Sequence, residues 1–178
     1  MENKLFETAR VATPTGEMVA GASGRGICYL GWADGRHHAS EMEQLARALG
    51  TPPVEVAAAR NPHLAALAAQ LAEYFDGRRR EFDLPLDPIG TPFQRRVWDA
   101  LARIPYGTTA SYSAQAAAMG CPRSVRAVAN ANGRNKISIV LPCHRVTGSD
   151  GSLTGYGGGL ERKAKLIFLE QIDKTNRP

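Results

Sequence analysis

The sequence predicts an α+β fold in two domains, residues 1–89 and 90–178. Short apolar segments separated by turn residues fill positions 4–33, whereas helical patterns dominate the second half. Residues 1–90 carry 9 Lys and Arg against 12 Asp and Glu, but residues 91–178 carry 13 against 5. We therefore expect a small antiparallel sheet with helices, then a basic, mostly helical module of helix-turn-helix (winged-helix-like) type. Such a basic module favours a polyanionic partner.

The first domain is predicted to begin with three antiparallel strands and to continue with two helices. The strands cover Leu5–Val11, Glu17–Ala22 and Ile27–Trp32. The helices cover residues 37–49 and 62–75, and glycines follow their ends at Gly50 and Gly77. Residues 82–88 are interpreted as a short strand that leads into a linker.

The second domain is predicted to open with a helix that starts at a capping box. Thr91 is its N-cap, Pro92 lies in the first turn and Gln94 completes the box. A second helix is expected from Ser111 to Gly120, and a third from about Cys121 to Ala131.

The third helix has one basic face, which at 100° per residue carries Arg123, Arg126, Ala127 and Asn130. Two helices joined by a tight turn, the second with such a face, predict a helix-turn-helix. The alternative is an ordinary solvated helix face.

The apolar run 137–141 predicts a buried strand that Pro142 ends, directly before Cys143, His144 and Arg145. A thiol reacts as the thiolate, and a neighbouring imidazole or cation favours that form. Cys143 is therefore a candidate nucleophile. The alternative is a small buried side chain with two solvated neighbours. Asn135 either caps its own turn or braces a neighbouring loop.

Near the C-terminus, the glycine run 157–159 indicates either disorder or backbone held close to another group. The closing helix, about residues 160–170, is expected to bury Leu160, Ala164, Ile167 and Phe168, with Glu170 at the margin of that apolar face.

With these residues assembled, the second domain resembles the O6-alkylguanine-DNA alkyltransferases. The resemblance covers about residues 90–170, in the family's order and spacing, whereas residues 1–89 match only in outline. The motifs that carry it are Gly90-Thr91-Pro92-Phe93-Gln94, Val97-Trp98, Ile104-Pro105-Tyr106-Gly107, Ser111-Tyr112, Val125-Arg126-Ala127-Val128, Asn135, Pro142-Cys143-His144-Arg145-Val146 and Gly155-Tyr156-Gly157-Gly158.

The resemblance implies a DNA repair protein that acts once. It would flip O6-alkylguanine (mainly O6-methylguanine, also O4-methylthymine) out of double-stranded DNA and transfer the alkyl group irreversibly to Cys143. His144 would take the thiol proton through a water, and Glu170 would orient His144.

By the same resemblance, Arg126 would fill the place of the flipped base. Tyr112 would crowd the 3′ phosphate and donate a hydrogen bond to the base, and Asn135 would brace the site. The carbonyls of Cys143 and Val146, the N–H of Gly157 and the neighbouring Tyr156 would bind the base. Further DNA contacts are expected from Arg123, Ser124, Ala127 and Asn130.

We expect no cofactor and no metal. Some family members hold a structural zinc in the first domain, but here Cys28 has only His37 and His38, too far along the chain. The three cysteines show no C-x-x-C spacing, and we find no signal peptide and no apolar run long enough to cross a membrane. A cytoplasmic monomer is therefore expected.

Three other functions compete with this interpretation. A related group of non-catalytic lesion binders lacks the acceptor cysteine. The presence of Cys143 argues against that function here. A Cys-His hydrolase would usually separate nucleophile and base in sequence and would leave the basic helix unexplained. A simple DNA-binding regulator would need the helix but no activated thiol.

Overall fold

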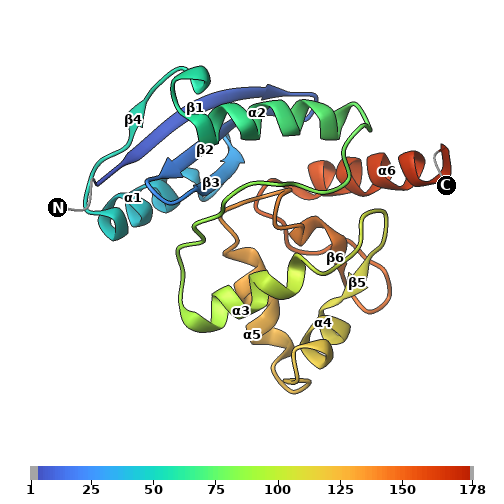
Figure 1. Ribbon diagram of the computed structural model, residues 1–178. Coiled ribbons are helices and arrows are strands. Elements are labelled where there is room, and N and C mark those ends of the chain that lie inside the picture. The colour runs from blue at the N-terminus through green and yellow to red at the C-terminus, as the bar shows by residue number, and fades with distance from the viewer. Residues whose placement is uncertain (1–3, 177–178) are drawn as a thin grey trace. The chain divides into compact units, whose positions relative to one another are not determined.

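The computed structural model describes residues 4–176 (Figure 1). By its internal contacts the chain divides into two compact units, residues 1–89 and 90–178, which we interpret as two domains.

The first unit is built on a four-stranded sheet of order β3-β2-β1-β4. Its three antiparallel strands were predicted and are confirmed: β1 Phe6–Thr13, β2 Gly16–Ser23 and β3 Ile27–Trp32. The fourth strand, β4 Val54–Glu55, pairs with β1 in parallel and was not predicted. Two exposed residues are too short a segment to display a period of two.

Two helices cover the sheet from opposite sides (Figure 1). α1, His38–Leu49, packs Leu45 into a cluster with Phe6 and Tyr29, and left-handed Gly50 caps it. α2, Pro62–Phe75, buries Leu64, Leu67, Leu71 and Tyr74 and begins at Asn61, whose side chain accepts the N–H groups of His63 and Leu64. Both predicted helices are confirmed.

The strand predicted over residues 82–88 is wrong. A single bridge links Leu86 to Ile27, and Ile27 N–H donates to the Pro85 carbonyl at 2.9 Å. Pro85 and Pro88 have no N–H to donate, so a regular ladder cannot form here.

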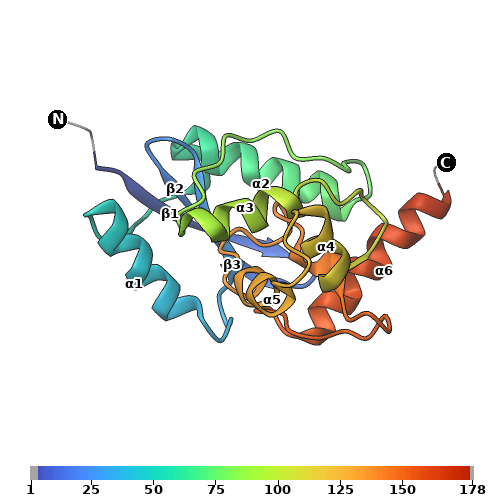
Figure 2. The same cartoon turned by 90° about the horizontal axis from the view of Figure 1, so that it is seen from below.

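The second unit has four longer helices. They are α3 Pro92–Leu101, α4 Tyr112–Ala118, α5 Val125–Gly133 and α6 Leu160–Asn176. α3, α4 and α5 pack against one another (Figures 1 and 2). The capping box of Thr91 and Gln94 is confirmed. α5 begins at Val125, later than expected from Cys121, and Ser124 precedes it as N-cap without a side-chain cap bond.

Short elements complete the second unit. β5, Ala110–Ser111, pairs in parallel with β6, Val146–Thr147. Between α5 and β6 lies the 3-10 helix η2, Cys143–Arg145. Within residues 4–176 no helix is both long and apolar enough to cross a membrane.

The buried strand predicted over residues 137–141 is also wrong. The segment is a compact loop in which Leu141 N–H donates to the Ile137 carbonyl at 3.0 Å, and Ile139 has φ +70°. Ile137, Ile139 and Leu141 are buried as expected. An apolar run therefore indicated burial correctly but not conformation. Left-handed backbone is strained for a β-branched residue, and such residues often lie near functional sites.

The inward face of α6 differs from the prediction as well. Leu160 and Phe168 are 48% and 65% exposed, Ala164 is exposed and Ile167 is half-buried. The buried side chains are instead Lys163, Leu166, Glu170 and Asp173. Charged groups can occupy a buried face where they are paired. Lys163 Nζ donates to the Thr154 carbonyl at 2.9 Å, and Glu170 accepts from Arg145 Nε at 2.9 Å.

Candidate active site

Cys143 is the first residue of η2, and its side chain is 8% exposed. Its backbone N–H donates to the Leu141 carbonyl at 2.8 Å, which fixes the thiol at the end of the buried loop. The loop thus delivers Cys143 without the strand that the sequence predicted.

Asn135 contacts the thiol directly. Its Nδ2 donates to Cys143 Sγ at 3.1 Å and to the Leu141 carbonyl at 2.8 Å, while its Oδ1 accepts Ile137 N–H at 3.0 Å. The last two bonds close the loop, as a bracing residue would. The first places a hydrogen-bond donor where a thiolate would carry its charge. That contact was not predicted from the sequence.

His144 is fully buried, and its two ring nitrogens differ. Nε2 lies 2.7 Å from Glu170 Oε1, whereas Nδ1 has no hydrogen-bond partner within the described part of the chain. Burial lowers the pKa of His144, although the bond to Glu170 acts in the opposite direction. The imidazole is therefore neutral near pH 7, with its proton on Nε2 and a lone pair on Nδ1.

Besides His144, two residues donate hydrogen bonds to the Glu170 carboxylate. Arg145 Nε donates to Oε2 at 2.9 Å and Arg145 Nη2 to Oε1 at 3.0 Å, and Gly107 N–H donates to Oε2 at 3.3 Å. Burial would raise the pKa of the Glu170 carboxyl, but the hydrogen bonds from His144 and Arg145 and the positive charge of Arg145 outweigh it and lower the pKa to about 2. Glu170 is thus an ionised, buried carboxylate.

Tyr112 and Lys163 meet at one carbonyl group. Tyr112 Oη and Lys163 Nζ each donate to the Thr154 carbonyl at 2.9 Å, and the ammonium lies 5.8 Å from the centre of the Tyr112 ring. Burial lowers the pKa of Lys163, and the charge of Cys143 opposes that shift. Lys163 was not predicted as a site residue, because a lysine in the sequence of an amphipathic helix normally indicates a solvated face.

The residues expected to bind the base lie around the same thiol. Val146 opens β6 and is buried, and the Tyr156 hydroxyl is buried as well. Burial, followed by the charges of Cys143 and Glu170, raises the pKa of Tyr156. A Cβ placed on Gly157 would meet no protein atom within 4 Å, so its backbone is open to a ligand.

The residues expected to contact DNA form a separate surface on and before α5. Arg123, Arg126, Ala127 and Asn130 are exposed, and Ser124 is half-buried. Val128 is buried beneath them. The structure therefore brings Cys143, His144, Asn135 and Glu170 together in one centre and leaves the α5 residues on the surface of the unit.

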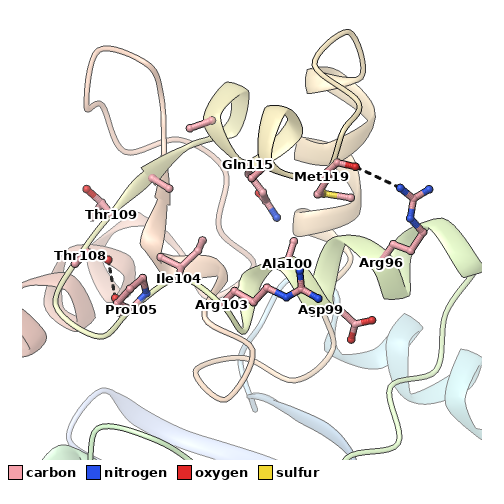
Figure 3. A pocket seen from close by; sticks show the side chains of 13 residues that line it. Arg96, Asp99, Ala100, Arg103, Ile104, Pro105, Thr108, Thr109, Gln115 and Met119 are labelled. Atoms are coloured by element: carbon pink, nitrogen blue, oxygen red, sulfur yellow. Dashed lines mark hydrogen bonds between the residues drawn. The ribbon is translucent and has the colours of Figure 1, made fainter.

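Away from Cys143, a pocket of about 570 Å³ lies between α3, α4 and the connection that joins them (Figure 3). The lining of this pocket is mostly apolar. Arg96 and Arg103 project from α3 beside Asp99. The pocket does not include Cys143. Cys28 lies in the core of the first unit, and among residues 4–176 no group of three or more His, Cys, Asp and Glu side chains could hold a metal ion.

Comparison with known protein families places both units. Residues 8–88 match the model "6-O-methylguanine DNA methyltransferase, ribonuclease-like domain", and residues 92–172 match "6-O-methylguanine DNA methyltransferase, DNA binding domain".

Individual relatives agree with these matches. The constitutive methylated-DNA–protein-cysteine methyltransferase of Bacillus subtilis is 54% identical over 112 residues, 62% of this chain and 68% of the relative. The Mycolicibacterium paratuberculosis enzyme of the same name is 55% identical over 112 residues, with the same coverage of 62% and 68%. Among solved structures, Mycobacterium tuberculosis OGT in complex with DNA is similar, with a TM-score of 0.79 and 38% identity over 94% of both chains.

Proposed function

The chain belongs to the 6-O-methylguanine DNA methyltransferase family, and we propose that Cys143 is the residue that accepts the alkyl group. The protein is a DNA-binding repair enzyme, a methylated-DNA–protein-cysteine S-methyltransferase. In the reaction the bond between the alkyl carbon and guanine O6 breaks and a carbon–sulfur bond forms. The departing guanine needs one proton, and the thiol must lose one. The thioether is not reversed, so each molecule acts once.

His144 removes the thiol proton. Its buried Nδ1 carries a lone pair and can accept through one water, which supports a relay from Cys143 to the imidazole. The imidazolium that forms is stabilised by Glu170, 2.7 Å from Nε2. Because Arg145 keeps Glu170 ionised, the carboxylate is present before the proton arrives, and no side chain has to move.

One hydrogen-bond donor and one positive charge stabilise the thiolate itself. Asn135 Nδ2 donates to Sγ at 3.1 Å, and the buried ammonium of Lys163 interacts favourably with a negative charge on Cys143. These contacts are worth most in a site that excludes water, because the low local dielectric strengthens them. Asn135 and Lys163 therefore lower the barrier to attack.

Tyr112 changes partner when the base enters. In the free protein its hydroxyl donates to the Thr154 carbonyl, which Lys163 also holds. Tyr112 can turn to the base while Lys163 keeps that carbonyl paired, so the exchange leaves no buried group unsatisfied. The Cys143 and Val146 carbonyls, the Gly157 N–H and the buried Tyr156 then hold the base against the thiolate.

α5 binds duplex DNA through its exposed face. Arg123, Ser124 and Asn130 contact the backbone and grooves, and the small side chain of Ala127 allows close approach. Arg126 occupies the place that the flipped alkylguanine leaves in the stack. The preferred lesion is O6-methylguanine. The protein acts as a monomer, because one chain holds the whole set of reacting groups.

The observation that carries this proposal is a pair of contacts made by adjacent residues of η2. Asn135 Nδ2 donates to Cys143 Sγ at 3.1 Å, and His144 Nε2 lies 2.7 Å from Glu170 Oε1. The proposal is tested with a Cys143→Ser variant and a duplex that carries one O6-methylguanine with a labelled methyl group. The wild-type protein takes up one label per molecule. The variant takes up none but binds the duplex with affinity close to wild type, because phosphate contacts supply most of the affinity.

A non-catalytic lesion binder would bind this duplex and leave the label on the DNA in both proteins. Label uptake by Cys143→Ser would instead show that another residue is the acceptor. Either result would overturn the assignment of Cys143.

A further inference from the structure

A pair of buried side-chain amides attaches α5 to α4. Asn132 Nδ2 donates to Gln115 Oε1 at 2.6 Å, and Gln115 Nε2 donates to Asn132 Oδ1 at 3.2 Å. Gln115 is only 4% exposed and Asn132 only 5%. Each amide therefore depends on the other, because a buried amide without its partner loses the hydrogen bonds that it makes in water.

The same pair reaches a third helix. Gln115 Nε2 also donates to the Val97 carbonyl of α3 at 3.3 Å, and in Figure 3 the Gln115 side chain points from α4 toward α3. Next to Asn132, the Ala131 carbonyl accepts the indole N–H of Trp98 at 2.9 Å. The last turns of α5 are thus held by directional bonds to both neighbouring helices.

Within the described part of the chain, the exposed first turns of α5 make no such side-chain bonds to the neighbouring helices. Arg126 and Ala127 are exposed, and the residue that anchors this part in the core is the apolar Val128. Apolar contacts resist separation but are non-directional, so they fix the rotation of a helix about its axis less well than paired amides do. The rotation of α5 is therefore set mainly at its C-terminal end.

Rotation matters because Arg126 and Asn132 lie on different sides of the helix. Six residues at 3.6 per turn place them roughly 120° apart, one facing DNA and the other facing the core. With side chains about 5–6 Å from the axis, a turn of roughly 20° moves the tip of Arg126 by about 2 Å. A misplacement of about 1 Å can cost on the order of 100-fold in rate.

We propose that the Gln115–Asn132 pair is a positioning element that fixes the rotation of α5 and so holds Arg126 at the place of the flipped base. This inference rests on the role proposed above for Arg126. Within residues 4–176 neither side-chain amide bonds to Cys143, whose thiol accepts from Asn135 Nδ2 and whose backbone N–H donates to the Leu141 carbonyl. Asn132 meets Asn135 through the backbone, where the Asn135 N–H donates to the Asn132 carbonyl at 3.1 Å, and a change of the Asn132 side chain leaves that carbonyl in place. The pair thus acts on repair in duplex DNA and not on the chemistry of the thiol.

The test is the double variant Gln115→Met/Asn132→Leu, which replaces both amides by apolar side chains of similar size. Because neither partner is left unpaired, its melting temperature stays close to wild type. Single-turnover repair of O6-methylguanine in a duplex slows by about tenfold or more. The reaction with free O6-benzylguanine, which needs no flipping, stays within about twofold of wild type.

Two further variants accompany it. The exchange variant Gln115→Asn/Asn132→Gln keeps both amides but moves their contact. Its rate of duplex repair also falls relative to its rate with free O6-benzylguanine. Leu101→Ala opens a cavity in the core beside α3, so the variant loses stability. It keeps the wild-type ratio of the duplex repair rate to the rate with free O6-benzylguanine.

A wild-type ratio in both amide variants would overturn the inference and leave the pair a purely structural contact. Equal losses on the two substrates would overturn it as well, since they would place the effect at the thiol. If the wild-type protein itself transferred no methyl group from the duplex, the proposed function would fail instead, and the two failures are thus distinguished.

Discussion

Nε2 of His144 lies 2.7 Å from Oε1 of Glu170, and both side chains are almost fully buried. The contact leaves Nδ1 as the only ring nitrogen that can accept a proton. The orientation of the imidazole therefore follows from a carboxylate on α6, 26 residues farther along the chain.

Replacing His144 by Ala should slow transfer from the duplex and from free O6-benzylguanine alike. Thiolate formation is common to the two reactions, and a general base contributes roughly 100- to 10,000-fold. Single-turnover rates at pH 7.5 measure the effect. A loss confined to the duplex would contradict the role of a base and would indicate a DNA contact.

Stability should fall on acidification, beginning near pH 6.5. His144 and Glu170 both have lowered pKa values in the folded protein, the latter about 2 against an ordinary 4.5. The unfolded chain therefore binds protons that the folded chain does not, first at the histidine below about pH 6.5 and then at the carboxylate between about pH 5 and 2.

Urea unfolding between pH 7.5 and pH 3 checks this expectation. Glu170→Gln should flatten the part of the profile below pH 5, although the variant starts from lower stability because Arg145 loses its charge partner. Stability that is constant or rises as the pH falls from 7 to 4 would contradict the assignment of both groups.

Arg126→Ala should impair repair in duplex DNA far more than attack on free O6-benzylguanine. Only the duplex reaction needs the extrahelical base, and a lost stacking contact of about 1–3 kcal/mol corresponds to roughly 5- to 150-fold in rate. Equal losses on the two substrates would leave Arg126 an ordinary phosphate or structural contact.

Lys163→Met should slow both reactions and move the pH dependence of the rate upward. The ammonium is buried and favours the negative form of Cys143, so a thiolate without it needs a higher pH. Lys165→Met is the matched control, since Lys165 is exposed on the same helix and pairs with Glu161 at 2.7 Å. A slower Lys163→Met enzyme with an unshifted pH profile would indicate a role only in holding the loop.

Much of the fold could be predicted because its signals are local. The three strands, the helices of the first unit and the capping box of Thr91 depend on residues close together in sequence. The Pro-Cys-His-Arg-Val motif identified the family for the same reason. The exposed face of α5 followed from helical periodicity.

The failure on α6 has one physical origin, which is pairing between residues that lie apart in the sequence. On α6, Lys163 and Glu170 are buried because Thr154, His144 and Arg145 satisfy them, so the apolar residues Leu160 and Phe168 face outward. Periodicity alone assigns charged residues to the solvent and thus selects the wrong face. The loop 137–141 differs from the predicted strand for another reason. The nearby Asn135 amide bonds the backbone of Ile137 and Leu141, so the loop needs no partner strand.

The central claim is that Cys143 is the acceptor, and peptide mapping by mass spectrometry tests it most directly. The protein is incubated with duplex DNA that carries O6-methylguanine, digested, and compared at its three cysteines. Cys28 is buried and its pKa is raised to about 12, first by burial, so it should not react. We expect one added methyl group, on the peptide that contains Cys143. A methyl group on the peptide of Cys121 or Cys28, with Cys143 unmodified, would contradict it.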